Sequence, residues 1–504
     1  MAEEYLTDEK YLERVNSRLI QNIDNRSDNE ELDDAYIKLR QQMYFPIDLS
    51  LPFNSLNELV DKYDEEQNNS SDTIGIVQTC GDTDDKVLSL TKDDSSFFSS
   101  QPIRKIIFAP PGCSKTRFTR RLALQLAQKN DTGMFPFYLP CYLLNKANDK
   151  KEDLIDLAYK MQVIMIGEKN FDEIINRHAD NGLLLIDGLD ESSEDDRKLI
   201  AKSLKNFLGE HQNFGFVITA RLRQYDKDEL VDVSNTQYHY IKKLDDRAVF
   251  SFIREWSRLF RSIRGEAAET DEAEVKRITD IISFVNNSCD DNIRSFVRIP
   301  MHLSNMLNMR EDDCEDFPCS IDQYYNKYLN LTMRGVSSDA KFYKKVVAYT
   351  AYWMSCCPHK RYVSIDKKTL TDRVLRSKMS SKKMRGIDRK PVEEILDTLV
   401  NKMSVLTQVS LDRGDEYRFE HLSLQEYLTA KALMSEETTD FDGYIRKDCS
   451  AVDFIRRVTY DNSWKEYDQI IIFILQLSDL KEEKREEIEY LLKKKGIYDS
   501  VNTL

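Results

Sequence analysis

Apolar runs and helical patterns alternate along the chain between residues 104 and 244. Short runs in which nearly every residue is apolar or aromatic indicate strands that are buried on both faces. The runs are RKIIFA at 104–109, FPFYLPCYLL at 135–144, GLLLIDGLDE at 182–191, FGFVITARLR at 214–223 and YHYIKKL at 238–244. Segments with helical spacing, such as KTRFTRRLALQLAQK at 115–129, lie between them. This alternation predicts a parallel sheet with helices on both faces.

From about residue 245 the pattern becomes mostly helical. The segment at 245–260 begins with two aspartates and continues with apolar residues at helical spacing, and the segment at 320–334 resembles another amphipathic helix. The densest apolar run, IIIFIL at 470–475, indicates a buried helix and is far shorter than the roughly 20 residues that span a bilayer. We therefore expect an α/β domain followed by helical domains and no membrane span.

The first hundred residues are acidic and only partly periodic. A helix is expected at 8–23, with apolar side chains on one face: Tyr11, Leu12, Val15, Leu19 and Ile20. Residues 1–100 carry 9 basic and 23 acidic side chains, so almost all of the net charge of −15 lies there. An acidic segment disfavours nucleic acid as its partner, and we expect a solvated surface with a linker or a small helical interaction domain.

Length and cysteine content narrow the class of protein further. A chain of 504 residues is expected to form several domains. Its nine cysteines show no disulfide framework, and the charged first residues fit neither a signal peptide nor a transit peptide, so we expect a cytoplasmic protein. Cys356, Cys357 and His359 lack a second cluster and indicate packing rather than a metal site. No unit of 30–45 residues recurs, which excludes a leucine-rich-repeat, TPR or WD40 sensor.

The loop after the first apolar run nearly matches the phosphate-binding pattern G-x-x-x-x-G-K-[ST]. In FAPPGCSKT, Ala109 replaces the first glycine and Ser114 replaces the glycine before Lys115. The lysine is expected to contact the β- and γ-phosphates, and the Thr116 hydroxyl is expected to bind Mg²⁺. The residues expected to bind nucleotide here are Ala109, Pro110, Pro111, Gly112, Cys113, Ser114, Lys115, Thr116 and Arg117.

Carboxylates follow the third apolar run. Asp187 ends that run and is expected to hold Mg²⁺, while Asp190 and Glu191 can polarise a water molecule for attack on a phosphate. Such a buried cluster is costly without a cation. The alternative, an acidic turn that caps the next helix, is compatible with this role.

The fourth apolar run ends in Thr219 and Arg221. A guanidinium at a strand end can bind the γ-phosphate and so distinguish ATP from ADP. Taken alone, Arg221 is equally well interpreted as a surface arginine.

Two later segments make the pattern specific. VRIPMHLSNML lies at 297–307, and YRFEHLSLQEYLTAKAL lies at 417–433. With the loop, the D-G-L-D-E segment and ITAR at 218–221, they follow the order found in the NACHT class of STAND NTPases, which the chain resembles over roughly residues 100–480. Compact bacterial antiphage NACHT proteins, which have a short helical C-terminal domain, resemble it most.

The resemblance implies two further nucleotide contacts. Pro300 matches the proline that packs beside the adenine in this family. His421 lies in a segment that resembles the winged-helix signature F-x-H-x-S-x-Q-E-[FY], whose histidine contacts the diphosphate of ADP and latches the closed state. An imidazole is a suitable donor to phosphate.

The resemblance also implies a division into domains. It consists of an acidic, mostly helical region with a linker at 1–95, a NACHT P-loop domain at 96–245, a helical domain at 246–335, a winged-helix domain at 336–435 and a short helical C-terminal domain at 436–504.

Ser114 departs most from the expected pattern. That loop position favours a residue without Cβ, and the strain is expected to weaken nucleotide binding by about 1–2 kcal/mol, roughly tenfold. Because Lys115, Thr116, Asp187 and Glu191 are present, we expect a working nucleotide site with slow hydrolysis.

The leading hypothesis is an ATP/ADP-dependent switch that uses Mg²⁺ and forms homo-oligomers when a protein trigger releases the ADP-bound state. The resemblance implies a role in innate immunity against phage, with a phage-derived trigger, which we expect the C-terminal residues 440–504 to bind. An alternative is a scaffold that binds nucleotide without hydrolysing it. A motor-type P-loop ATPase fits poorly, because the near-neutral body of the chain lacks a basic groove for nucleic acid.

Overall fold

The computed structural model describes most of the chain beyond residue 101. The described ranges are 102–128, 133–141, 171–192, 194–221, 233–263, 270–309, 317–333, 340–356, 361–375, 391–411, 414–434, 450–461, 463–477 and 480–498, with a few isolated positions between and before them. The helix expected at 8–23 lies outside these residues, as do Cys357 and His359.

The chain divides into two compact units. The first contains the described residues of Asp33–Thr279 together with Val297–Leu303, and the second contains Asp280–Phe296 and the described residues of Ser304–Leu504. The division into five domains stays a prediction.

The first unit is built on a five-stranded parallel sheet. Its strands are β1 (Arg104–Phe108), β2 (Phe135–Pro140), β3 (Gly182–Asp187), β4 (Gly215–Ala220) and β5 (Gln237–Tyr240), in the order β2-β3-β4-β1-β5. Every residue of β2, β3 and β4 is buried, which explains why these strands are apolar throughout rather than alternating. The predicted parallel sheet is confirmed.

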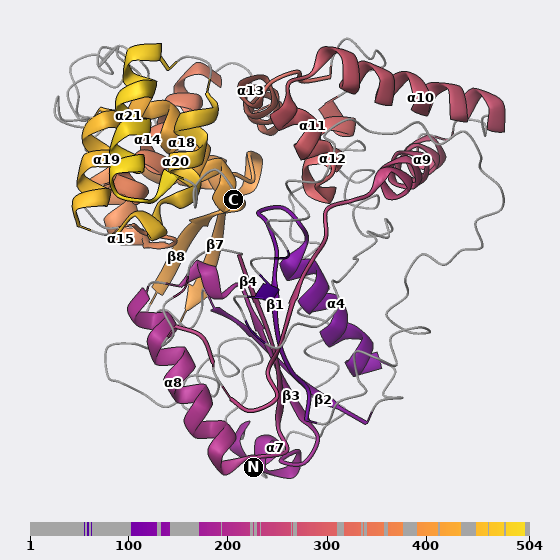
Figure 1. The fold of residues 1–504 in the computed structure, drawn as a ribbon, viewed down its shortest axis with the longest axis vertical. Helices are drawn as coiled ribbons and strands as arrows, with labels where there is room; N and C mark the ends of the chain where they lie inside the picture. The colour runs from indigo at the N-terminus through magenta and orange to yellow at the C-terminus, as the bar shows by residue number, and fades with distance from the viewer. Residues whose placement is uncertain are drawn as a thin grey trace. The chain divides into compact units, whose positions relative to one another are not determined.

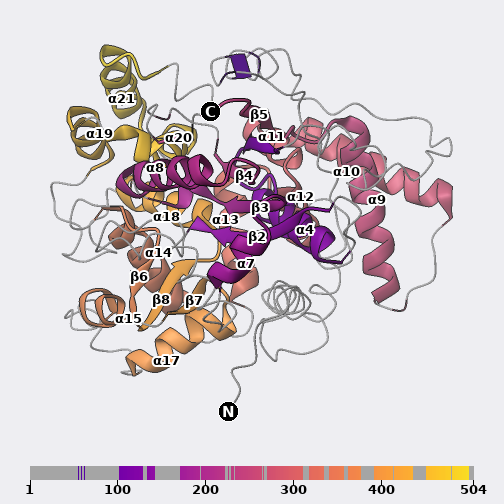
Figure 2. The same cartoon turned by 90° about the horizontal axis from the view of Figure 1, so that it is seen from below.

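Helices cover both faces of this sheet. α4 (Lys115–Gln128) and α8 (Glu194–Glu210) lie on opposite faces, as Figures 1 and 2 show. The unit also contains α7 (Phe171–Arg177), the short 3₁₀ helix η3 (Leu189–Glu191) and α9 (Asp246–Ile263). As the sequence pattern predicts, an aspartate caps α9: Asp245 Oδ1 accepts a hydrogen bond from the Ala248 N–H at 2.7 Å.

Helices α10 (Asp271–Ser288) and α12 (Pro300–Met309) each contribute residues to both units. The second unit is mostly helical. Its helices are α11 (Asp291–Val297, except for its last residue), α13 (Ile321–Thr332), α14 (Ala340–Cys356), α15 (Lys367–Thr369), α17 (Val392–Asp397), α18 (Leu422–Met434), α19 (Ala451–Tyr460), α20 (Asp468–Gln476) and α21 (Glu482–Lys494). Short π and 3₁₀ helices follow some of them: η6 (Leu370–Leu375), η8 (Thr398–Lys402) and η9 (Trp464–Glu466).

A small antiparallel sheet completes the second unit. β6 (Ile365–Asp366), β7 (Leu406–Leu411) and β8 (Gly414–Phe419) pair in the order β6-β8-β7. α18 follows β8 and is buried nearly all round, because α14, α19 and α20 pack against it. The run IIIFIL lies in α20 and is largely buried, as predicted. The winged-helix assignment of this region stays a prediction.

Candidate nucleotide site

The loop between β1 and α4 contains two residues in the left-handed backbone region. β1 ends at Phe108, and the N–H of Ala109 donates to the carbonyl of Ala220 on β4 at 3.0 Å. Gly112 and Ser114 both have positive φ, 81° and 64°, so the chain turns sharply before α4 begins. The first N–H groups of a helix have no acceptor within the helix and can therefore bind an anion.

Ser114 occupies the strained position that its replacement of glycine predicts. A φ of 64° lies in the left-handed region, which a serine enters at a cost of about 1 kcal/mol or more. Its carbonyl still accepts the first hydrogen bond of α4, from the Phe118 N–H at 2.8 Å. The serine therefore does not prevent α4 from beginning at the next residue.

Gly112 packs against the residues around Pro300. A Cβ added to Gly112 would lie 3.0 Å from Ile299, 3.1 Å from Met301 and 3.3 Å from the Nε2 atom of His302. These side chains flank Pro300, which begins α12, so the structure brings the predicted adenine contact close to the predicted phosphate loop. His302 is also buried beside Gly112, a position that no motif in the sequence predicted.

Three hydroxyl groups surround the carboxylate of Asp187 at the end of β3. Thr219 on β4 donates to Oδ1 at 2.8 Å, and Thr119 on α4 lies 3.1 Å from the same oxygen. Tyr138 on β2 donates to Oδ2 at 3.0 Å. A carboxylate has about four acceptor positions, so these contacts leave room for a water or metal contact. Mg²⁺ in nucleotide sites keeps most of its waters, which this arrangement fits.

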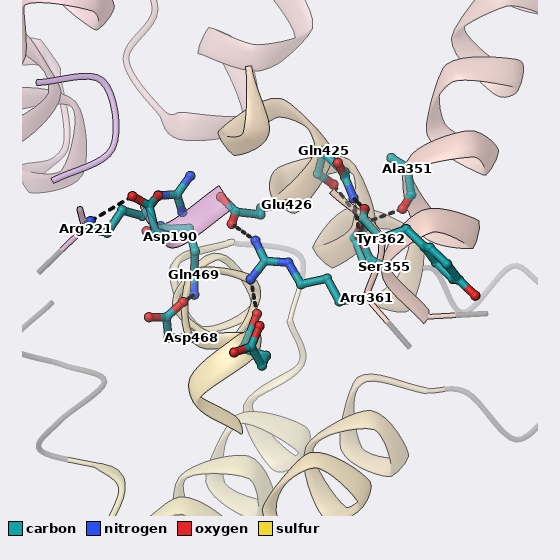
Figure 3. Close-up of polar contacts among 12 residues, drawn as sticks. Asp190, Arg221, Ala351, Ser355, Arg361, Tyr362, Gln425, Glu426, Asp468 and Gln469 are labelled. Carbon is teal, nitrogen blue, oxygen red and sulfur yellow. Dashed lines mark hydrogen bonds and ion pairs between the residues drawn. The ribbon is translucent and has the colours of Figure 1, made fainter. Parts of the chain in front are cut away.

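Asp190 lies between two cations. The N–H of Arg221 donates to Oδ1 at 2.9 Å, as Figure 3 shows, and the guanidinium Nε lies 2.9 Å from Oδ2. The ammonium of Lys115 lies 4.0 Å from Oδ1. The side chains of Lys115, Asp190 and Arg221 are 12%, 4% and 11% exposed, so little water screens these charges. The phosphate loop, the acidic turn and the end of β4 therefore meet at one carboxylate.

Glu191 ends η3 and is half-buried. Its carboxyl carbon lies 3.2 Å from where a Cβ on Gly188 would be, so this side chain folds back over the glycine. Gly188 has φ 74°, and its N–H donates to the Thr219 hydroxyl at 3.0 Å. The turn after Asp187 thus holds both following acids at the carboxyl edge of the sheet, where ligands bind in such folds.

Family comparison agrees with this geometry. Residues 106–259 match the family model of the NACHT domain. They form a NACHT domain. A comparison with curated proteins finds no match. Among solved structures, the crystal structure of Cdc6p from Pyrobaculum aerophilum is similar over 66% of this chain and 88% of that one, at 10% identity and a TM-score of 0.26.

The described residues of the NACHT domain do not form a metal site by themselves. Within the described residues, no group of three or more His, Cys, Asp and Glu side chains is placed to bind a metal ion. Thr116 and Asp187 would therefore hold Mg²⁺ only together with phosphate oxygens and water, as expected for a P-loop. Among these residues, too, every helix is too short or too polar to cross a bilayer.

Two buried thiols border the nucleotide site. Burial raises the pKa of Cys113, in the loop, to about 11, although Lys243 and Lys115 act in the opposite direction. Burial also raises the pKa of Cys141, just after β2, and the charges of Asp187, Glu191 and Asp190 raise it further. Both cysteines therefore stay protonated at neutral pH and are poor nucleophiles.

His421 lies in the second unit, directly before α18. It is half-buried, its ring centroid lies 6.1 Å from that of Tyr328 on α13, and its carbonyl accepts the Leu424 N–H at 3.0 Å. Its contact with the diphosphate of ADP stays a prediction.

The other polar residues of the α18 signature hold the second unit together. Gln425 Nε2 donates to the Ser355 hydroxyl at 3.2 Å and to the Tyr362 carbonyl at 3.0 Å, and Glu426 forms a buried ion pair with Arg361 at 2.6 Å (Figure 3). These side chains bind other parts of the protein, so they are structural.

Proposed function

We propose that this protein is an ATP/ADP-dependent switch of the STAND type, in which the nucleotide state controls homo-oligomerisation. One observation carries the proposal: Asp190 is placed between Lys115 of the phosphate loop and Arg221 of β4. A γ-phosphate would compete with this carboxylate for the same two cations, since phosphate oxygens are strong acceptors for both. The end of β4 and the acidic turn would therefore take different positions when ATP is bound and when ADP is bound.

In the ADP state, Pro300 would contact the adenine and His421 would contact the diphosphate. Lys115, Thr116 and Asp187 hold the phosphates and Mg²⁺. Exchange of ADP for ATP removes the histidine latch, and the opened protomers assemble. These contacts follow the resemblance to the NACHT family.

Hydrolysis of ATP resets the switch. Glu191 polarises the attacking water with Asp190 beside it, and Arg221 stabilises charge on the γ-phosphate. We expect slow turnover, because Ser114 strains the loop that positions the phosphates.

The biological part of the proposal is innate immunity, in the form of bacterial defence against phage. A phage-derived protein would act as the trigger, and residues 440–504 would bind it. This part rests on the resemblance of the chain's layout to compact antiphage NACHT proteins, together with the NACHT match at 106–259.

The alternative is a scaffold that binds nucleotide without hydrolysing it. The φ of 64° at Ser114 favours it, because a strained loop can lose catalytic positioning before it loses binding. ATP turnover by the wild type that disappears in Glu191→Gln would exclude this alternative.

The nucleotide content of the purified protein tests the switch. Gently purified protein is denatured, and the released nucleotide is quantified by ion-exchange chromatography. We expect near-stoichiometric ADP from the wild type and from Lys202→Ala, an exposed lysine on α8, and none from Lys115→Ala. The mass of the protein with Mg²⁺ and a non-hydrolysable ATP analogue should then exceed its mass with ADP. A wild type that carries no nucleotide and binds none would overturn the proposal.

A further inference from the structure

Arg197 on α8 is an arginine buried inside the NACHT domain, beside the acidic turn and the segment after β4. It is 2% exposed. Its Nε pairs with Glu229, which is equally buried, and its Nη1 donates to the carbonyl of Ser192 at 2.5 Å. Arg197 therefore joins the residue that follows Glu191 to a residue downstream of β4.

Burying such an ion pair contributes little to stability. Removing two charges from water costs about as much free energy as their attraction returns, and apolar residues of similar volume often serve the fold equally well. The presence of the pair of Arg197 and Glu229 is therefore better explained by the two segments that it holds in place than by added stability.

A second contact leads from Arg197 to Arg221. The guanidinium of Arg197 lies 5.9 Å from the centroid of the Tyr225 ring, within the range of a cation–π contact. The Tyr225 hydroxyl donates to the carbonyl of Arg221 at 2.9 Å. The same ring lies 5.9 Å from that of Phe108, the last residue of β1 before the phosphate loop.

These contacts close a ring of interactions. Arg221 binds the carboxylate of Asp190 with its N–H and its guanidinium, and Asp190 lies two residues before Ser192. One set of contacts leads from Arg197 through Ser192 to the turn that contains Asp190. The other leads from Arg197 through Tyr225 to Arg221, which binds the same Asp190. Arg197 therefore links the acidic turn to the segment after β4.

We propose that Arg197 is a positioning residue that fixes Glu191 and Arg221 as one group and thereby lets the site distinguish ATP from ADP. This inference rests on the proposed switch function. Glu191 and Arg221 act at the γ-phosphate, which only ATP has, whereas the phosphate loop binds both nucleotides. Loss of the Arg197 contacts therefore weakens ATP binding and leaves ADP binding in place.

The test compares ATP and ADP affinity in a variant that removes both charges together. Arg197→Met/Glu229→Leu removes both charges of the pair rather than one, a change that buried ion pairs tolerate far better than loss of a single partner. We expect its Kd for Mg²⁺·ATP to rise about tenfold and its Kd for Mg²⁺·ADP to stay within about twofold, measured by titration calorimetry. ATP turnover should fall by about the same factor.

Two further variants separate positioning from stability. Tyr225→Phe keeps the ring and removes only the hydroxyl that binds the Arg221 carbonyl, and its Kd for ATP alone should rise about threefold. Arg258→Met/Glu274→Leu removes an ion pair between α9 and α10, 2.8 Å long, and should change neither affinity. Equal changes in ATP and ADP affinity, or no change, in the Arg197 and Tyr225 variants would overturn the inference while the switch function stands. A wild type that binds neither nucleotide would overturn both.

Discussion

The φ of 64° at Ser114 makes this residue the weak point of the phosphate loop. Ordering the loop around phosphate forces a serine into a conformation that glycine adopts freely. We predict that Ser114→Gly binds both ATP and ADP about fivefold tighter, since roughly 1 kcal/mol of strain is removed. Titration calorimetry with each nucleotide and Mg²⁺ measures the effect.

Two variants serve as controls for Ser114→Gly. Ser114→Ala removes the hydroxyl but keeps the Cβ, so it should not tighten binding. Ser404→Gly relieves a positive φ of 49° in the second unit and should leave both affinities unchanged. If the alanine and glycine variants at position 114 bind nucleotide equally well, the hydroxyl rather than backbone strain limits affinity.

Residues that end or directly follow an apolar strand were predictable from the sequence, and their partners across the sheet were not. Asp187 ends β3 and Arg221 directly follows β4, so the pattern of the chain places them at one edge of a parallel sheet. Tyr138 and Thr119 contact Asp187 only because β2 lies beside β3 and α4 packs across them. Strand order and packing arise from tertiary structure, which the linear pattern does not contain. Arg197 escaped detection for the same reason.

At the scale of elements, α18 shows the limit of periodicity. Its buried residues lie on every side, including Gln425, Glu426 and Thr429, so it has no polar face that a helical pattern could reveal. The signature sequence rather than amphipathicity identified this segment. The strands of the first unit, by contrast, were found from their apolar runs alone, because both of their faces are buried.

The contact between α13 and α18 supplies a prediction about pH. Burial alone would raise the pKa of Asp322 on α13, but hydrogen bonds from Lys431 and Tyr427 on α18, and from Asn326, lower it below the ordinary 3.8. A lowered pKa in the folded state means that the ionised carboxylate stabilises the fold above pH 3.8. That stability is lost as the pH falls through the folded pKa.

We predict that Asp322→Asn unfolds more easily than the wild type by about 1 kcal/mol at pH 7, since the contacts are partly exposed and partly screened. The deficit should be the same at pH 5 and smaller below pH 3.8. Urea unfolding in a Trp256→Phe background measures it, because the remaining tryptophans, Trp353 and Trp464, both lie in the second unit. A deficit that persists undiminished below pH 3.8 would show that the charge of Asp322 is not its source.

At the scale of the whole molecule, the two units carry different parts of the predicted nucleotide site. The phosphate loop, the acidic turn and Pro300 belong to the first unit, and His421 belongs to the second. The resemblance predicts that one ADP molecule contacts both parts. Coupled unfolding tests this, because a ligand stabilises every unit whose folded form it binds.

We predict that Mg²⁺·ADP stabilises both units and that His421→Ala restricts the effect to the first. At a concentration of ADP about 100 times its Kd, the first unit should gain about 2.7 kcal/mol of unfolding free energy. Trp256 alone reports the first unit in a Trp353→Phe/Trp464→Phe background, and the Trp256→Phe protein reports the second. His211→Ala, directly after α8 in the first unit, serves as a control and should leave the second unit's response intact. If ADP stabilises only the first unit in the wild type, His421 does not bind the diphosphate, and nucleotide must control assembly through the NACHT domain alone.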